Sequence, residues 1–327
     1  MKVIYRRLPS KKIRCAATIG VFDGIHLGHQ FILKKVIKEA RKQNFSSLII
    51  TFDILPQQFL LKKQLFSIHE LKKIPCGYIA DFDQKTALVK SLSLDYCWFL
   101  KTSQFLLKLS PKDFIKYVCR AFAIKKLIVG QDFRFGYRAR GEVNLLKKLQ
   151  GEFGFDLSVV QKKTKQKRPI SSSYIRELIQ RSEFKMVNKF LGRNFSINGR
   201  VEKGRGIGSK LGFPTANISL SGYVIPSPGV YVGYVVIKRK VYLAAVNIGL
   251  RLTVSKDVEE KLIEAHIINF NKNVLGQKIK LVFLEKIRDE RIFSSYDKLK
   301  LAIAKDVRLI TSKYSTRLPK YPQPIVL

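Results

Sequence analysis

The stretch Gly20–His29 reads Gly-Val-Phe-Asp-Gly-Ile-His-Leu-Gly-His, and at this stretch a strand pattern gives way to a helix pattern. Residues 15–22 are uncharged and apolar, which predicts a buried strand. From Leu27 to Asn44, apolar residues recur at helical spacing, namely Phe31, Ile32, Val36 and Ile37. A helix N-terminus offers unpaired backbone N–H groups and a positive dipole end, so this junction is predicted to bind phosphate.

Two histidines stand three residues apart at the start of the predicted helix. His26 and His29 can donate hydrogen bonds that stabilise charge growing on a phosphoryl group, while Gly24 and Gly28 let the backbone approach a ligand closely. The alternatives are two surface histidines or half of a metal site. A zinc site needs further ligands, and neither the two remaining histidines nor the four cysteines have paired-ligand spacing. Phosphate binding is therefore favoured over metal binding.

The rest of the first half alternates between strand and helix patterns. Strands are expected over residues 46–52, 95–100, 126–129 and 156–160, and helices over 110–122 and 142–153. Ser110 and Pro111 are a typical N-cap and first helical residue. This alternation predicts an α/β domain with a doubly wound parallel sheet, whose ligands bind beyond the carboxyl ends of the strands.

The pattern changes after about residue 185. Short strand-like runs replace the long helices, at residues 195–201, 230–237, 241–248, 262–270 and 278–284. They predict an antiparallel β-barrel or sandwich, closed by a helix over 295–310. We therefore expect two domains, at 1–185 and 186–310, followed by an extended tail at 311–327.

The chain of 327 residues carries a formal net charge of +38. Such a charge favours encounter with nucleic acids, anionic lipids or acidic small molecules. The basic residues are dispersed, however, and only residues 161–168 form a dense patch, without a zinc-finger, basic-zipper or RNA-binding signature. Solvated helix faces are the favoured explanation, so no specific nucleic acid is expected as a partner. A basic nucleic-acid-binding protein remains the alternative from another functional class.

Export and membrane insertion are not favoured. Residues 211–237 lack charge, but three prolines and four glycines among them indicate strands and turns rather than a spanning helix. The apolar run after the basic start is short and leads directly into Asp23, unlike a signal peptide. The four cysteines show no secreted disulfide framework. We expect a cytoplasmic protein, and nothing in the sequence sets its oligomeric state.

Two further segments of the first half suggest nucleotide binding. Asp132 and Phe133 lie in a glycine- and arginine-rich loop after a predicted strand, which suits a flat heterocycle carrying phosphates. Farther on, a helix is predicted to open with three hydroxyl residues, Ser171, Ser172 and Ser173. Hydroxyls there are good caps in any protein, but Arg176 follows one turn later and could bind a polyphosphate together with them.

The His-x-Gly-His and Ser-Ser-x-x-Ile-Arg patterns resemble those of the nucleotidyltransferase superfamily, whose domain is built on a Rossmann-like sheet. The resemblance implies that His26 and His29 contact the triphosphate of ATP during adenylyl transfer. The remaining cofactor-binding positions expected in the first motif are Gly20, Phe22, Asp23, Gly24 and Gly28.

The second half contains a glycine-rich loop that is not a Walker motif, because no Gly-Lys-Ser/Thr ends it. Its glycines, Gly204, Gly206, Gly208 and Gly212, could wrap backbone N–H groups around phosphate. The run Gly-Phe-Pro-Thr-Ala-Asn at 212–217 resembles the flavokinase signature. The resemblance implies that Thr215 and Asn217 hold Mg²⁺ and the ATP phosphates, with Pro214 in the binding loop.

Glu264 is the candidate general base of the second half. Strand alternation places it on the same face as His266, where a carboxylate can take the proton of a primary alcohol that attacks the γ-phosphate of ATP. The commoner alternative is an ordinary outward-facing glutamate. Three further positions follow in the order of the family and are expected to hold flavin or nucleotide, namely Asn247, Arg251 and Arg288.

Over nearly its whole length, the sequence resembles the prokaryotic bifunctional riboflavin kinase and FMN adenylyltransferase family, or FAD synthetases. This implies that the C-terminal barrel phosphorylates riboflavin to FMN and that the N-terminal domain converts FMN to FAD with release of pyrophosphate. ATP and Mg²⁺ serve both steps. The chain departs from the family pattern at Leu55, where the family commonly has histidine, and in residues 251–254 and 268–270. A riboflavin kinase with a degenerate first domain is the alternative.

Overall fold

The computed structural model describes residues 1–5, 12–63, 77–161, 164–165, 168–220, 222–252 and 259–317. The chain divides into two compact units, Met1–Ser172 and Ser173–Val326. Each unit is described by itself. The domain boundary expected at residue 185 stays a prediction.

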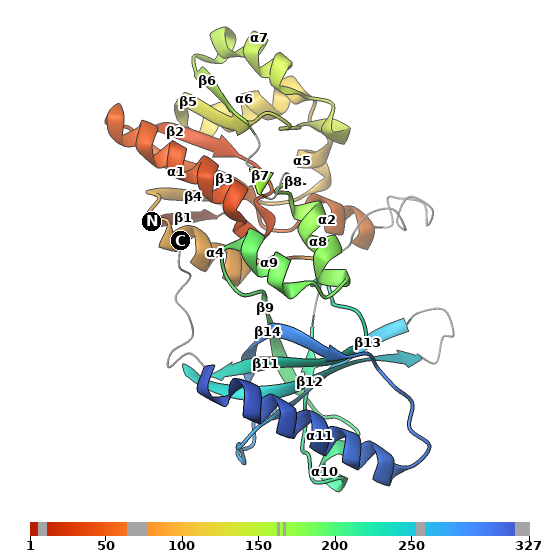
Figure 1. The fold of residues 1–327 in the computed structure, drawn as a ribbon. Helices are drawn as coiled ribbons and strands as arrows, with labels where there is room; N and C mark the ends of the chain where they lie inside the picture. Colours follow the sequence, from red (N-terminus) through yellow and green to blue (C-terminus); the bar gives the residue numbers. More distant parts are fainter. Residues whose placement is uncertain are drawn as a thin grey trace. The chain divides into compact units, whose positions relative to one another are not determined.

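The first unit is built on a parallel sheet with the strand order β1-β4-β3-β2-β5-β6 (Figure 1). Its strands are β1 (Lys2–Tyr5), β2 (Arg14–Ile19), β3 (Ser46–Phe52), β4 (Tyr96–Leu100), β5 (Ala123–Gly130) and β6 (Asp156–Val160). Every adjacent pair in this sheet is parallel. The predicted doubly wound sheet is confirmed. The strand order reverses between β2 and β5, so the loops after these two strands lie at the topological switch point.

Helices and short 3₁₀ turns alternate with the strands. They are η1 (Asp23–Ile25), α1 (Leu27–Lys42), α2 (Pro56–Lys62), α4 (Phe82–Ser91), α5 (Gln104–Lys108), α6 (Pro111–Ala121), η2 (Tyr137–Ala139) and α7 (Val143–Phe153). In α6, the Ser110 hydroxyl accepts a hydrogen bond from the Asp113 N–H, and Phe114 and Val118 are buried in the core. A short pair, β7 (Thr164–Lys165) and β8 (Arg168–Pro169), precedes the end of this unit.

The second unit contains a closed antiparallel barrel with the order β10-β13-β12-β11-β14-β9. Its strands are β9 (Ser196–Glu202), β10 (Ala216–Ser219), β11 (Gly229–Ile237), β12 (Lys240–Leu252), β13 (Glu259–Ile267) and β14 (Lys278–Arg288). The predicted barrel is confirmed. The strand expected over 262–270 ends at Ile267, because Asn269 adopts a left-handed conformation (φ 55°) that turns the chain.

Four α-helices and a 3₁₀ turn accompany the barrel, α8 (Ser172–Gln180), α9 (Phe184–Leu191), α10 (Ile207–Lys210), α11 (Tyr296–Tyr314) and η3 (Ser315–Arg317). Phe184 of α9 stacks on Phe283 of β14 with a centroid separation of 5.2 Å. In Figure 1, α11 runs alongside the barrel strands, and its Ile310 and Tyr314 pack with Val232 of β11. The extended tail expected from residue 311 is corrected, because burial of Tyr314 continues the helix by one turn. Residues 318–327 lie outside the described residues.

The uncharged segment 211–237 forms β10, turns and β11, as predicted. A helix with the length and apolarity required to cross a membrane is not found in the described part of the chain.

Candidate active sites

The two histidines of the first unit meet at the start of α1. His26 is the N-cap, and its Nδ1 accepts a hydrogen bond from the backbone N–H of His29 (3.2 Å). The two imidazole rings stack with centroids 3.5 Å apart and planes 15° apart. Because Nδ1 of His26 accepts, the neutral ring carries its proton on Nε2 and can donate from there. The prediction that the two imidazoles come together at a helix N-terminus is confirmed.

The loop that leads from β2 to His26 has an unusual backbone. Phe22, Gly24 and Ile25 all have positive φ, at 49°, 76° and 39°. A Cβ at Gly24 would come within 2.7 Å of the Ile79 side chain, so this position requires glycine for two reasons. Left-handed backbone at non-glycine residues costs free energy and is concentrated at functional sites.

Asp23 holds this loop from inside the protein. Asp23 as a whole residue is only 1% exposed. It accepts hydrogen bonds from the backbone N–H groups of Ile79 (3.1 Å) and Ala80 (3.3 Å). The side chain therefore anchors the loop to residues 79–80, which the sequence does not reveal. Its predicted role in cofactor binding is not tested by these contacts.

The second motif of the first unit lies against the first. The Ser172 hydroxyl donates to the backbone carbonyl of Asp23 (3.0 Å), across 149 residues of sequence. A Cβ at Gly28 would lie 3.1 Å from the His26 ring and 3.6 Å from the carbonyl oxygen of Ile170. The structure thus brings together the His-x-Gly-His and Ser-Ser motifs. Ser173 and Arg176 belong to the second unit, so their predicted role stays a prediction.

Other loops at the same edge of the sheet are firmly tied. After β3, the Asp53 carboxylate accepts from the N–H groups of Ile54 (2.7 Å) and Thr102 (2.8 Å), which joins the ends of β3 and β4. Leu55, in the place of the family histidine, is buried and is the N-cap residue of α2.

After β5, Asp132 is exposed beside Gly130. Phe133 is half-buried, and its ring stacks on that of Phe135 with centroids 5.4 Å apart. Because β5 is parallel to its neighbour β2, these two residues after β5 lie at the same carboxyl edge of the sheet as the histidine loop after β2.

In the second unit, three polar residues form one row across the barrel wall. Asn217 of β10 is opposite Glu264 of β13, and Glu264 is opposite Asn247 of β12. Glu264 and His266 are half-buried, whereas Ile263, Ala265 and Ile267 are buried, so the predicted alternation is confirmed. His266 Nδ1 lies 2.9 Å from the carbonyl oxygen of Pro214, which ties the glycine-rich loop to β13.

Glycines of that loop lie directly against the two oxygen-bearing side chains. A Cβ at Gly204 would approach Asn217 Nδ2 to 1.9 Å, and one at Gly208 would approach Thr215 Oγ1 to 3.1 Å. Gly206 and Gly212 instead supply turns with positive φ. Because Gly204 and Gly208 have no side chains, Asn217 and Thr215 have room to lie against the loop, which forms a cradle around them.

Glu264 lies in an environment that changes its acidity. Burial raises the pKa of its carboxyl, and the positive charge of Arg205 opposes this shift. A carboxylate with a raised pKa is a stronger base than an exposed glutamate. Arg205 was not among the predicted site residues. The sequence shows only that Arg205 is a positively charged residue within the glycine-rich loop. Its proximity to Glu264 depends on the tertiary fold.

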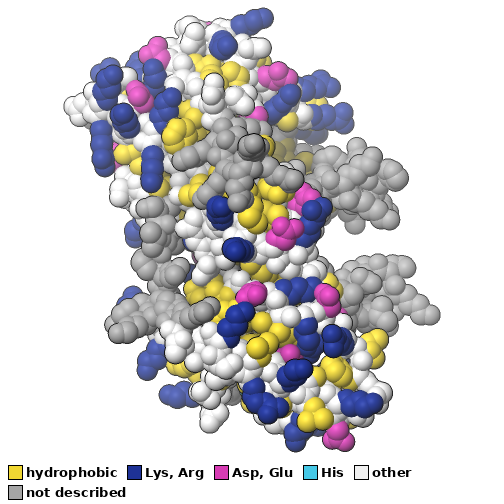
Figure 2. All heavy atoms as spheres, viewed as in Figure 1, with side chains coloured by type: hydrophobic (Ala, Val, Ile, Leu, Met, Phe, Trp, Pro, Cys, Tyr) yellow, Lys and Arg dark blue, Asp and Glu magenta, His cyan; other side chains and the backbone are white. Residues whose placement is uncertain are grey.

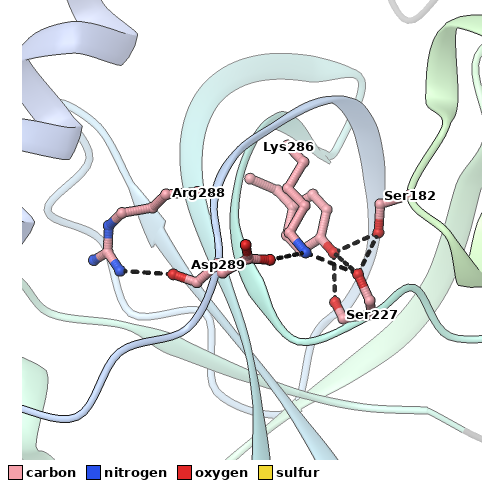
Figure 3. Close-up of polar contacts among 6 residues, drawn as sticks. Ser182, Ser227, Lys286, Arg288 and Asp289 are labelled. Atoms are coloured by element: carbon pink, nitrogen blue, oxygen red, sulfur yellow. Dashed lines mark hydrogen bonds and ion pairs between the residues drawn. The ribbon is translucent and has the colours of Figure 1, made fainter.

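Arg288 is held by α11 and by its own turn. Its Nε and Nη2 donate to the Asp306 carboxylate (3.0 and 2.8 Å). Its Nη1 donates to the backbone carbonyl oxygen of Asp289 (3.1 Å; Figure 3). Glu290, two residues on, has its carboxylate oxygen 2.6 Å from where a Cβ at Gly249 would lie. The turn after β14 thus places the Glu290 carboxylate beside β12, the strand that carries Asn247. The side chain of Arg251 lies outside the described residues.

A polar network supports the same turn. Lys286 pairs with Asp289 (2.7 Å) and donates to the Ser227 hydroxyl (2.9 Å), which is hydrogen-bonded to Ser182 (Figure 3). The hydroxyl of Tyr231 completes it by donating to the carbonyl of Ser227. This network links the α8–α9 connection to the barrel.

Among the residues that the structure describes, no three or more His, Cys, Asp or Glu side chains form a group suited to a metal ion. Figure 2 shows Lys and Arg side chains scattered over the visible face, interspersed with apolar ones.

Both halves of the chain match known families. Residues 8–174 match the FAD synthetase family model, and residues 191–313 match the riboflavin kinase model. The chain is 35% identical to a bifunctional riboflavin kinase/FMN adenylyltransferase of Buchnera aphidicola subsp. Schizaphis graminum, covering 96% of this chain and 99% of the relative. The Escherichia coli K12 protein of the same description is 33% identical, covering 89% and 90%. A crystal structure described as a macrolide-efflux protein from Streptococcus pneumoniae is also similar, with a TM-score of 0.78, 28% identity, and 93% and 95% coverage.

Proposed function

The chain belongs to the family of bifunctional riboflavin kinase/FMN adenylyltransferases, and from that premise we propose which of its residues carry each reaction. The enzyme phosphorylates riboflavin to FMN and transfers an adenylyl group from ATP to FMN, which yields FAD and pyrophosphate. Both domains are present, and the two relatives described as bifunctional match 96% and 89% of the chain. This favours the bifunctional enzyme over a kinase with a degenerate domain and over a nucleic-acid-binding protein.

We assign riboflavin phosphorylation to the row of polar residues on β10, β13 and β12. Glu264 accepts the proton of the primary hydroxyl of riboflavin as that oxygen attacks the γ-phosphorus of ATP, and ADP leaves with the bridging oxygen. The observation that carries this assignment is the cross-strand placement of Asn217 and Asn247 on either side of Glu264. The raised pKa of Glu264 suits the base role.

Mg²⁺ is the metal that this cradle suits. The hydroxyl of Thr215 and the amide oxygen of Asn217 are hard oxygen donors, and Gly204 and Gly208 leave room for these two side chains to lie against the loop. When bound, the ion neutralises charge on the ATP phosphates. Mg²⁺ usually keeps several waters and binds few protein oxygens together with substrate phosphates, rather than an all-protein cage.

We assign adenylyl transfer to the edge of the parallel sheet. His26 and His29 donate hydrogen bonds to the triphosphate, while an oxygen of the FMN phosphate attacks the α-phosphorus and pyrophosphate leaves. The N-terminus of α1 adds a positive dipole end at the same place. The stacked histidines and the bond from Ser172 to the histidine loop support this assignment.

The remaining predicted residues are proposed to complete the two sites. Gly20, Phe22, Asp23, Gly24, Gly28, Asp132, Phe133, Ser171, Ser172, Ser173 and Arg176 serve the adenylyltransferase domain, placed at residues 1–185. Gly204, Gly206, Gly208, Gly212, Pro214, Asn247, Arg251 and Arg288 serve the kinase domain, placed at residues 186–310. We propose that the enzyme works in the cytoplasm, where thiols such as those of Cys15, Cys97 and Cys119 stay reduced.

Two single variants test these assignments reciprocally. His29→Ala is expected to convert riboflavin to FMN and to form no FAD. Glu264→Gln is expected to form no FMN from riboflavin, yet to make FAD when FMN is supplied. Flavins separated by chromatography report both reactions. FAD formation by His29→Ala at the parental rate would contradict the histidine assignment, and FMN formation by Glu264→Gln would contradict the base.

A further inference from the structure

A buried lysine connects the histidine loop to the next strand of the sheet. Lys85 of α4 is only 2% exposed. Its Nζ donates to the backbone carbonyls of Val21 (3.0 Å) and Phe52 (3.1 Å). Val21 follows β2 and Phe52 ends β3, so one ammonium group joins the carboxyl ends of two adjacent strands. Thr51 Oγ1 donates to the same Val21 carbonyl (2.9 Å).

A buried position is energetically unfavourable for the charged side chain of Lys85. Burial lowers the pKa of the Lys85 ammonium, while the negative charges of Asp23 and Asp53 oppose that shift. Burying a charged group destabilises the folded protein unless opposite charges and hydrogen bonds compensate for the lost hydration. Asp23 and Asp53 are themselves the anchors of the histidine loop and of the loop after β3. Lys85 therefore lies between the two loops and is stabilised by the anchors of both.

Both carbonyls precede backbone that must be placed accurately. Val21 is followed by the left-handed residue Phe22, with which the turn to His26 begins. Phe52 is followed by Asp53 and by α2, whose N-cap is Leu55 and whose first residue is Pro56. Moving either carbonyl displaces the loop that follows it.

We propose that Lys85 is a positioning residue for adenylyl transfer, which fixes the histidine loop against the loop after β3. The proposal rests on the assignment of His26 and His29 to that reaction. Lys85 itself touches no reacting atom in this account, because its ammonium is committed to the two carbonyls. Its loss shifts both loops without removing a catalytic group.

The test replaces Lys85 by methionine, which keeps an unbranched side chain and removes the donors. Lys90→Met, on the exposed side of the same helix, is the matched control. Thr51→Val removes the other side-chain donor to Val21 without changing the shape of the side chain. Each variant is assayed for FAD formation from FMN and ATP and, in the same preparation, for FMN formation from riboflavin.

Folding of the first unit has its own probe. The single tryptophan of the chain, Trp98, is 3% exposed on β4, so its emission reports this unit alone. We expect Lys85→Met to keep native Trp98 emission and kinase activity, to raise the KM for both ATP and FMN, and to lose about 100-fold in kcat/KM for FAD formation. Thr51→Val is expected to show the same changes to a smaller degree, and Lys90→Met none of them.

If Lys85→Met keeps native Trp98 emission and its KM values are unchanged, the proposal is overturned. The KM values are the criterion because a partly inactive preparation lowers kcat alone. If Lys85→Met loses native emission, Thr51→Val decides the matter by the same KM criterion. His29→Ala is measured in parallel. If His29→Ala retains FAD formation, the assignment of the site has failed; if only Lys85→Met retains it, the positioning role has failed.

Discussion

A single added methyl group at Gly204 tests the geometry of the kinase cradle. In Gly204→Ala the new Cβ would lie 1.9 Å from Nδ2 of Asn217, so the amide must retreat by about 1.5 Å to reach an ordinary contact of 3.4 Å. The Asn217 side chain can rotate away, so we expect the barrel to stay folded. Misplacing a ligand-binding group by about 1 Å costs on the order of 100-fold in rate, so riboflavin phosphorylation is expected to fall by about that factor.

The assay follows FMN formation from riboflavin, ATP and Mg²⁺, with FAD formation from supplied FMN as the internal control. Gly276→Ala is the matched variant, because it adds a methyl group to a loop of the same unit with no atom within 4 Å. That position has a φ of 75°, whereas Gly204 has no positive φ, so this control carries the additional strain of a left-handed alanine, roughly 1–2 kcal/mol, without displacing a side chain. Gly204→Ala with a kcat within threefold of the parent enzyme would refute the role of the Asn217 amide.

Three further predictions concern the second unit. Glu264→Gln is expected to raise the melting temperature at pH 7, because the glutamine removes a partly buried negative charge. In the parent protein, the stability that protonated Glu264 contributes is fully present below the ordinary pKa of 4.5 and is lost as the pH rises through the raised pKa of the folded state. Calorimetry at pH 7 and pH 4 checks this, since the gain should shrink at the lower pH. Arg205→Gln is expected to shift the acidic limb of the kinase pH–rate profile to higher pH, because Arg205 lowers the pKa of Glu264; an unshifted limb contradicts that coupling. Asp306→Ala leaves the largely buried Arg288 guanidinium without its carboxylate and is expected to lower the free energy of unfolding in urea by about 2 kcal/mol, less than for a fully buried pair. An unchanged urea midpoint would show that this ion pair adds nothing.

The architecture of both units could be predicted from the sequence because periodicity is a local property. The strand over 46–52 and the N-cap at Ser110 were predicted at the residues where the structure has them. The strand β1 was missed, because four residues are too few to show alternation. β1 also lies in the basic segment 2–14, and only its Ile4 is buried.

The chemistry of the candidate sites was predictable where spacing alone places side chains together. His26 and His29 share a helix turn, and Glu264 and His266 share a strand face. The anchoring roles of Asp23 and Lys85 were not predictable, because their partners lie 56 and 64 residues away in the sequence. Such contacts depend on which loops the sheet brings to one edge, and no local pattern encodes them.

The measurement that tests the account most directly is a time course of the purified protein with riboflavin, ATP and Mg²⁺, with the flavins separated by chromatography. The account predicts that FMN appears first and that FAD follows as FMN is consumed, both made by the same chain. FMN that accumulates without any FAD would contradict the claim that the first unit is an active adenylyltransferase, and a reaction that yields neither product would contradict the claim for both units.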